Sequence, residues 1–119
     1  MKEDDILPLR QLYRTPEFEE FYQSLPDKVK MKCDYVLQIV GTVYNITTKF
    51  VKHIEKTELY EMRVSVGNNE YRTVMFSIDH SNLIEARRII LLNGFQKKSS
   101  KDYKKEIEKG LRILKRYAE

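Results

Sequence analysis

Two arginines lie where the sequence alternates between apolar and polar residues, and this pattern could do chemistry on a phosphate. Arg63 lies between Met62 and Val64, so on an extended strand its side chain points to the opposite face from theirs. A Gly-Asn-Asn turn at residues 67–69 folds the chain back, which brings Arg72 within a residue or two of Arg63 in register. The two guanidinium groups repel each other, and a bound phosphodiester would relieve that repulsion because the planar fork of arginine suits phosphate oxygens.

Carboxylates on the same strand faces allow a second interpretation of the arginines. Glu61 and Glu70 could form cross-strand ion pairs with them, each contributing from a few tenths to about 1 kcal/mol. The residues alone therefore leave open whether the arginines bind a phosphate or only stabilise the sheet.

A run of cations comes just before the last helix that we expect. Lys97, Lys98 and Lys101 lie at its start, where positive charge opposes the helix dipole, so contact with phosphate explains them better than stability does. A solvated loop is the alternative. Tyr103, in the first turn, is either a core residue or a phenol that contacts RNA by stacking or hydrogen bonding.

A polar and basic connection precedes the two strands and offers further candidates. Lys52, His53 and Lys56 lie in it and could contact RNA, although a lone histidine is more often a surface residue than a catalyst. Other kinds of site are not indicated. The sequence has no glycine-rich phosphate loop, no cluster of metal ligands and no nucleophile with a supporting base, so we expect neither a metal nor a cofactor.

The elements that must position these residues follow from the hydrophobic spacing. Apolar residues at helical intervals predict two helices that start at Thr15-Pro16 and Pro26, the second ending near Gly41, and form a hairpin. Alternation predicts strands at residues 60–66, 71–78 and 83–95, with shorter extended pieces at 10–14 and 50–54. A last helix starts at about Ser100, with Ser99 as its cap and an apolar stripe. That stripe comprises Tyr103, Ile107, Gly110, Leu111, Leu114 and Tyr117.

This order of elements predicts an α+β fold, with an N-terminal helical hairpin packed on a small antiparallel sheet and a C-terminal helix. The length of 119 residues predicts one domain, and residues 1–9 look like a loose lead-in to it. The single cysteine excludes an intrachain disulfide, and neither a secretory signal nor a membrane span is recognisable. We therefore expect a cytoplasmic protein with no membrane partner.

Charge is distributed unevenly along the chain. Residues 1–58 hold 9 Lys and Arg against 10 Asp and Glu, whereas residues 59–119 hold 13 against 8. A basic second half favours a polyanionic partner, with a solvated basic helix face as the alternative.

Several strings of residues in this basic half resemble the RelE/ParE toxin superfamily, and most closely its HigB-like branch. They are the Leu-Tyr-Glu-Met-Arg-Val string at 59–64, Glu-Tyr-Arg at 70–72, Leu-Leu-Asn-Gly-Phe-Gln-Lys-Lys-Ser at 91–99, and Asp-Tyr at 102–103. The resemblance covers about residues 10–118. It implies a compact sheet flanked by helices and the toxin of a type II toxin–antitoxin system. Such a toxin cleaves mRNA in the ribosomal A site and is neutralised by an antitoxin, which we expect to be a helix-turn-helix protein.

The resemblance also implies roles for particular residues. Arg63 and Arg72 correspond to basic residues of the active site, the second of which holds the scissile phosphate, and Lys97 or Lys98 to the cation after the last strand. Tyr103 corresponds to a tyrosine near the start of the C-terminal helix. The implied reaction needs no metal: the ribose 2′-OH attacks the adjacent phosphorus and leaves a 2′,3′-cyclic phosphate and a 5′-OH.

This chain has Glu61 where RelE has a lysine, so the general base stays open among Glu61, His53, a lysine and Tyr103. Two other functions stay open as well. One is a ParE-like toxin that binds DNA gyrase, and the other is an inactive relative that only pairs with its antitoxin.

Overall fold

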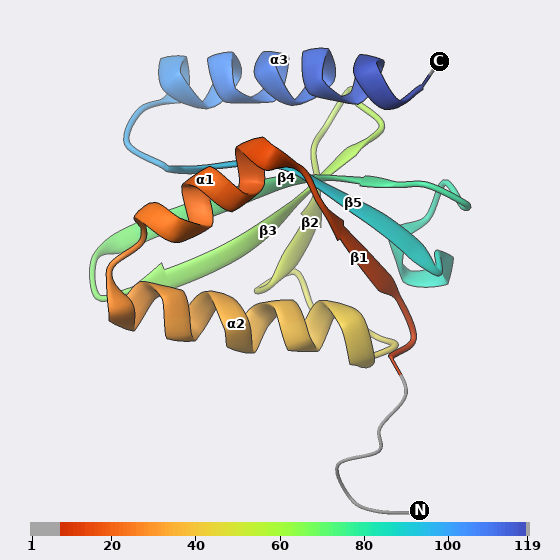
Figure 1. Cartoon of the computed structure of the whole chain (residues 1–119), viewed down its shortest axis with the longest axis horizontal. Helices are drawn as coiled ribbons and strands as arrows, with labels where there is room; N and C mark the ends of the chain where they lie inside the picture. Colours follow the sequence, from red (N-terminus) through yellow and green to blue (C-terminus); the bar gives the residue numbers. More distant parts are fainter. Residues whose placement is uncertain (1–7, 119) are drawn as a thin grey trace, which may run out of the picture.

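The computed structural model describes residues 8–118, so residues 1–7 of the expected N-terminal lead-in lie outside the described part. Figure 1 shows a mixed sheet with helices on both faces, and the α+β class is confirmed. No helix in the described part of the chain is long and apolar enough to span a membrane. The elements are β1 (Gln11–Arg14), α1 (Pro16–Ser24), α2 (Asp27–Thr42), β2 (Val51–His53), β3 (Leu59–Val66), β4 (Asn69–Ser77), η1 (Leu83–Glu85), β5 (Arg88–Gln96) and α3 (Ser100–Tyr117).

The sheet has five strands in the order β1-β5-β4-β3-β2. The predicted meander is confirmed, since β3 with β4 and β4 with β5 are antiparallel neighbours. The prediction of a wholly antiparallel sheet is wrong, because β1 pairs parallel to β5, with Gln11 opposite Arg88. A short turn forces two strands to run in opposite directions, but β1 and β5 are separated by most of the chain and are under no such constraint.

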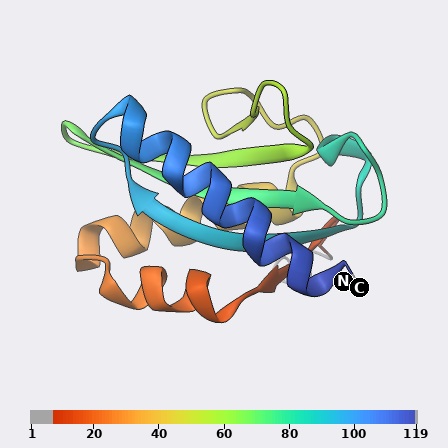
Figure 2. The ribbon, with the colours of Figure 1, turned by 90° about the horizontal axis from the view of Figure 1, so that it is seen from above.

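The helices cover the two faces of the sheet, as Figure 2 shows with α3 crossing one face. The predicted N-terminal hairpin needs correction. The helices α1 and α2 follow each other closely in the chain, yet each packs mainly on the sheet, α1 over β5 and α2 over β3. Each helix must bury its apolar face against another layer, and here the sheet provides that layer for both. Tyr22 of α1 contacts α2 through its side chain: its Oη donates a hydrogen bond to Asp34, and the ammonium of Lys30 lies 5.3 Å from the centroid of its ring.

Local signals in the sequence fix the helix ends. Thr15 caps α1 by accepting a hydrogen bond from the backbone N–H of Phe18, and Ser99 caps α3 by accepting one from Asp102. Both caps were predicted. The third strand was placed too early, because residues 83–85 form the short helix η1 and β5 begins only at Arg88. Asn82 caps η1 through its side chain, and this polar interaction competes with an extended backbone.

Two glycines allow helices to approach the sheet closely, Gly110 for α3 and Gly94 for α1. A Cβ added at Gly110 would lie 2.8 Å from Val74 Cγ1, and one added at Gly94, on the other face, would lie 2.1 Å from the ring of Phe21. The helix α3 buries Ile107, Gly110 and Ile113. The predicted stripe was therefore partly wrong: Leu111 and Tyr117 are exposed, since the contact with the sheet turns the helix so that Ile113 faces inward. Its first turn reaches β3 through the hydrogen bond from Tyr103 to Glu61.

Candidate functional site

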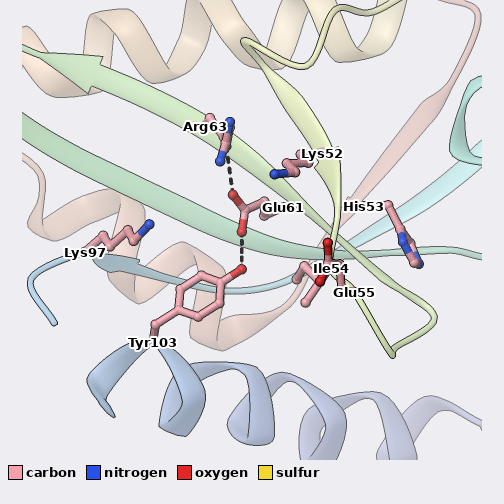
Figure 3. A pocket seen from close by; sticks show the side chains of 8 residues that line it. All are labelled: Lys52, His53, Ile54, Glu55, Glu61, Arg63, Lys97 and Tyr103. Atoms are coloured by element: carbon pink, nitrogen blue, oxygen red, sulfur yellow. Dashed lines mark hydrogen bonds and ion pairs between the residues drawn. The ribbon is translucent and has the colours of Figure 1, made fainter. Parts of the chain in front are cut away.

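A pocket of about 360 Å³ lies on the α3 side of the sheet, at the start of that helix. Figure 3 shows its lining, which comes from four segments far apart in the sequence: β2 and the connection after it, β3, the residue after β5, and the first turn of α3. The volume lies within the roughly 300–1,000 Å³ of small-molecule sites. The lining residues are Lys52, His53, Ile54, Glu55, Glu61, Arg63, Lys97 and Tyr103.

Tyr103 organises one wall of this pocket. Its hydroxyl donates a hydrogen bond to Oε1 of Glu61, and its ring packs edge-on against Phe95 with 5.9 Å between ring centroids. The ammonium of Lys97 lies 5.3 Å from the centroid of the same ring, within the range of a cation–π contact. One side chain therefore holds both a carboxylate and a cation of the pocket in place.

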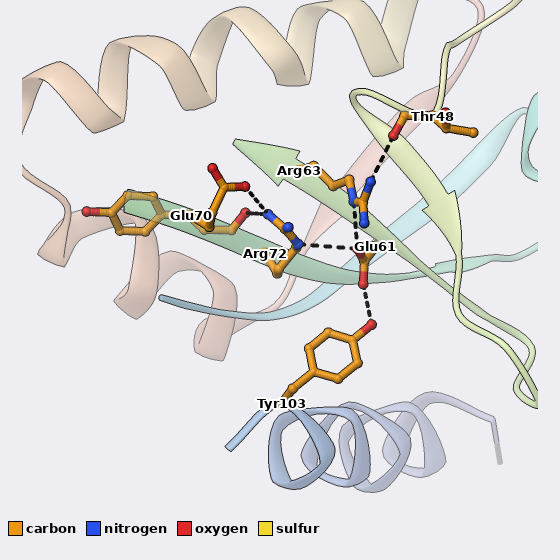
Figure 4. A network of polar contacts seen from close by, with 7 residues as sticks. Thr48, Glu61, Arg63, Glu70, Arg72 and Tyr103 are labelled. Atoms are coloured by element: carbon orange, nitrogen blue, oxygen red, sulfur yellow. Dashed lines mark hydrogen bonds and ion pairs between the residues drawn. The ribbon is translucent and has the colours of Figure 1, made fainter. Parts of the chain in front are cut away.

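The carboxylate of Glu61 lies at the centre of a charged network, shown in Figure 4. Its Oε2 accepts a hydrogen bond from Nε of Arg63 at 2.8 Å and lies 3.2 Å from Nε of Arg72. Arg72 extends the network to Glu70, with Nη1 at 3.1 Å from Oε1. The register explains this arrangement, because Arg63 is directly opposite Arg72 across β3 and β4. The predicted pairing of the arginines is confirmed. Of the cross-strand ion pairs weighed as an alternative, the one between Arg72 and Glu61 is present, whereas the other two pairs each lie within one strand.

The two arginines differ in how much of their side chains is buried. The side chain of Arg63 keeps 27% of its surface exposed and lines the pocket, whereas that of Arg72 keeps 6% and lies outside the lining. The Nε of Arg72 makes no aligned hydrogen bond, so its attraction to Glu61 is purely between charges. A phosphate entering the pocket would therefore meet Arg63 and Lys97 first. The role expected for Arg72, holding the scissile phosphate, stays a prediction that would need Glu61 to move.

The electrostatics of Tyr103 limit what it can do. Burial, and then its hydrogen bond to Glu61, raise the pKa of Tyr103 above its ordinary value of 10.0. The phenol is therefore neutral at physiological pH. It can donate a hydrogen bond there, but it cannot act as the general base.

The structure divides the five predicted RNA contacts into two groups. Lys52 and His53 line the pocket, and the histidine is fixed by a 2.7 Å contact between its Nε2 and the carbonyl of Thr57. Three lysines are exposed and lie outside the lining, namely Lys56, Lys98 and Lys101.

Sequence reasoning missed two lining residues and one buried arginine. Ile54 and Glu55 line the pocket, but they come from an irregular connection whose path has no local signal. Arg10 is 2% exposed and donates five hydrogen bonds to backbone carbonyls, which makes it a structural residue. Its partners lie 30 to 74 positions away, so nothing near it in the sequence reveals its role. Among residues 8–118, no group of three or more His, Cys, Asp or Glu side chains is placed to hold a metal ion.

Comparison with known proteins connects this geometry to a family. A family model described as phage derived protein Gp49-like (DUF891) matches residues 20–115. The chain belongs to this family. The match to the Gp49-like family covers all eight residues that line the pocket and most of α3. No curated protein and no solved structure matches the chain.

Proposed function

We propose that this Gp49-like protein is the toxin of a type II toxin–antitoxin system and cleaves mRNA on the ribosome. One observation carries the proposal: Arg63, Lys97, Lys52, Glu61 and Tyr103, drawn from four distant segments, line one pocket. Its cations suit a phosphodiester, and a carboxylate and a phenol lie within reach of it. The resemblance of the surrounding strings to the RelE/ParE superfamily, and to its HigB-like branch, supports the same reaction.

The reaction starts when a phosphate enters the pocket and takes Arg63 from Glu61. The guanidinium and the ammonium of Lys97 then stabilise the negative charge that grows on the phosphoryl oxygens, commonly the largest contribution to catalysis. Glu61, released from one of its two cations, accepts the proton of the ribose 2′-OH. The 2′-oxygen forms a bond to phosphorus and the bond to the 5′-oxygen breaks, which leaves a 2′,3′-cyclic phosphate. The departing oxygen takes a proton from Lys97.

Arg72 and Tyr103 act as positioning residues in this scheme. Arg72 stays buried beside Glu61 and keeps the carboxylate charged and oriented after Arg63 turns to the substrate. Tyr103 holds Glu61 through its hydroxyl and Lys97 through its ring. The proposed protein acts in the cytoplasm, where it meets mRNA in the ribosomal A site, and a cognate helix-turn-helix antitoxin neutralises it.

Controlled expression in growing bacteria tests this function. Inducing the wild-type chain should arrest growth and shorten cellular mRNA within minutes, and Arg63→Ala should abolish both effects. Arg87→Ala is a matched control, because it removes an exposed arginine that lies outside the pocket lining, and it should be as toxic as the wild type. DNA damage with intact mRNA would instead identify a gyrase-binding toxin. Unaffected growth at strong expression would identify an inactive relative.

A further inference from the structure

A second pocket adjoins the first along the same face, and its chemistry differs. It has a volume of about 410 Å³ and shares His53 with the first pocket as a common wall. Its other walls are the end of β4, the turn after it, and residues 57–58 of the β2–β3 connection. The lining residues are His53, Thr57, Glu58, Phe76, Ser77, Ile78, Asp79, His80 and Ser81.

The charges of the two pockets are opposite in sign. The first holds three cationic side chains against two carboxylates, which leaves it net positive. The lining of the second includes no lysine or arginine and has two carboxylates, Glu58 and Asp79. A phosphate would be repelled from the second pocket. A flat, uncharged group would be accepted, because Phe76 and Ile78 provide apolar walls and the imidazoles of His53 and His80 provide further ring surface.

The two carboxylates differ in whether they are free to bind a ligand. Asp79 accepts hydrogen bonds from the backbone N–H groups of Arg87 and Arg88, which hold it in the turn. Glu58 is exposed and makes no side-chain hydrogen bond or ion pair in the described part of the chain. Its oxygens are therefore free to accept hydrogen bonds from a ligand.

We propose that the second pocket binds a nucleobase next to the phosphate held in the first pocket, and that Glu58 selects a base with an exocyclic amino group. A single-stranded base that is turned out of its stack is recognised by ring surfaces and by hydrogen bonds along its edge, and this pocket offers both. A carboxylate accepts a hydrogen bond from the amino group of cytosine but meets a carbonyl oxygen at the same position of uracil. The inference rests on the proposed function, since it takes the phosphate of the first pocket to belong to RNA.

Cytidine 3′-monophosphate and uridine 3′-monophosphate are suitable probes. They share the sugar and the phosphate and differ only along the base edge, in the 4-amino group of cytosine against the 4-carbonyl and N3 proton of uracil. Inorganic phosphate serves as the probe without a base. Titrations of the isotope-labelled full chain, followed by nuclear magnetic resonance, should show phosphate shifting only signals of the first pocket, such as those of Arg63 and Lys97. The cytidine nucleotide should also shift the Ile78 methyl and His80 signals, and should bind about fivefold more tightly than the uridine nucleotide.

Glu58→Gln should bring the two nucleotides to equal affinity, because the amide can pair with either an amino group or a carbonyl. Glu55→Gln is the matched control. It makes the same change three residues away, on a side chain that lines the first pocket and not the second, and it should keep the fivefold ratio.

The outcomes separate the inference from the proposed function. If phosphate shifts the Arg63 and Lys97 signals while both nucleotides shift nothing beyond them, the base pocket is wrong and the phosphate site stands. If the nucleotides also shift the Ile78 and His80 signals but bind equally, the selection by Glu58 is wrong. If phosphate and nucleotides all leave these signals unchanged, the phosphate site and the base pocket are both wrong.

Discussion

Arg63 and Arg72 face each other across β3 and β4, and both direct Nε toward the same carboxylate oxygen of Glu61, at 2.8 and 3.2 Å. The two arginines are not equivalent, because the first is open to the pocket and the second is buried beneath it. One carboxylate therefore holds two cations, and only one of them is free to exchange it for a substrate phosphate. This asymmetry is the basis of the roles proposed for the pocket.

The buried pair of Glu61 and Arg72 should be strongly coupled in its effect on the free energy of unfolding. Glu61→Leu should destabilise the protein by about 3 kcal/mol, because it leaves Arg72 buried with only the more exposed Glu70 as a partner. Adding Arg72→Met should restore most of that loss, since an apolar pair needs no compensating charge. Urea denaturation of both single variants and the double variant gives the coupling free energy, which should exceed about 1 kcal/mol. Additive effects would show that the buried pair does not interact.

Tyr103 should serve the site through its hydroxyl as well as its ring. Tyr103→Phe removes the hydrogen bond to Glu61 and keeps the ring against Phe95 and Lys97, so we expect a loss of about 1–2 kcal/mol of stability. Without this hydrogen bond Glu61 is more mobile, so Tyr103→Phe should also slow RNA cleavage about tenfold. Tyr103→Leu, which also removes the ring, should slow cleavage further. If Tyr103→Phe cleaves RNA as fast as the wild type, the hydroxyl does not position the carboxylate.

Arg10 should be essential for folding although it lies far from the pocket. Arg10→Lys should cost about 3 kcal/mol or more, because an ammonium cannot reach the five carbonyls that the guanidinium bonds, and buried acceptors are left unpaired. Arg14→Lys is the matched control, at the end of the strand that Arg10 precedes. The Arg14 side chain is 37% exposed, pairs with Glu19 and lies over the rings of Phe18 and Tyr22. A lysine can keep these exposed contacts, so the substitution should cost less than about 1 kcal/mol. Thermal unfolding measures both, and equal losses would contradict the structural role of Arg10.

Cys33 should make the stability depend on pH in the alkaline range. Burial raises the pKa of its thiol from 9.0 to about 11. Because the folded state holds this proton more tightly, the contribution to stability is complete below about pH 9 and is lost as the pH rises through about 11. Between about pH 8 and pH 10.5 the wild type should lose about 2 kcal/mol more than Cys33→Ala in urea denaturation. Parallel pH profiles of the two proteins would contradict the burial of the thiol.

Local patterns predicted much of the fold. The caps at Thr15 and Ser99 and the turn at Gly67 depend on neighbouring residues, so the helix starts and the pairing of Arg63 with Arg72 could be inferred. The parallel pairing of β1 with β5 could not, because it joins segments with no short connection.

The sequence predicted most of the residues that form the site, but not their contacts or their burial. Arg63, Lys97 and Tyr103 were expected to act together, and they do line one pocket. The contact of Tyr103 with Glu61 spans 42 positions, and no local signal reveals a contact at that distance. The burial of Arg72 depends on how α3 and β4 pack, which alternation of residues along a strand does not specify.

The chemistry of the cut RNA ends tests most sharply whether the protein cleaves mRNA by attack of the ribose 2′-OH. Purified protein should be added to ribosomes carrying a defined mRNA, and the products examined for their termini. We predict a 2′,3′-cyclic phosphate and a 5′-OH, with a rate at least about 100-fold lower for Arg63→Ala and unchanged for Arg87→Ala. Intact mRNA, products with 5′-phosphate ends, or cleavage by Arg63→Ala at the wild-type rate would contradict this mechanism.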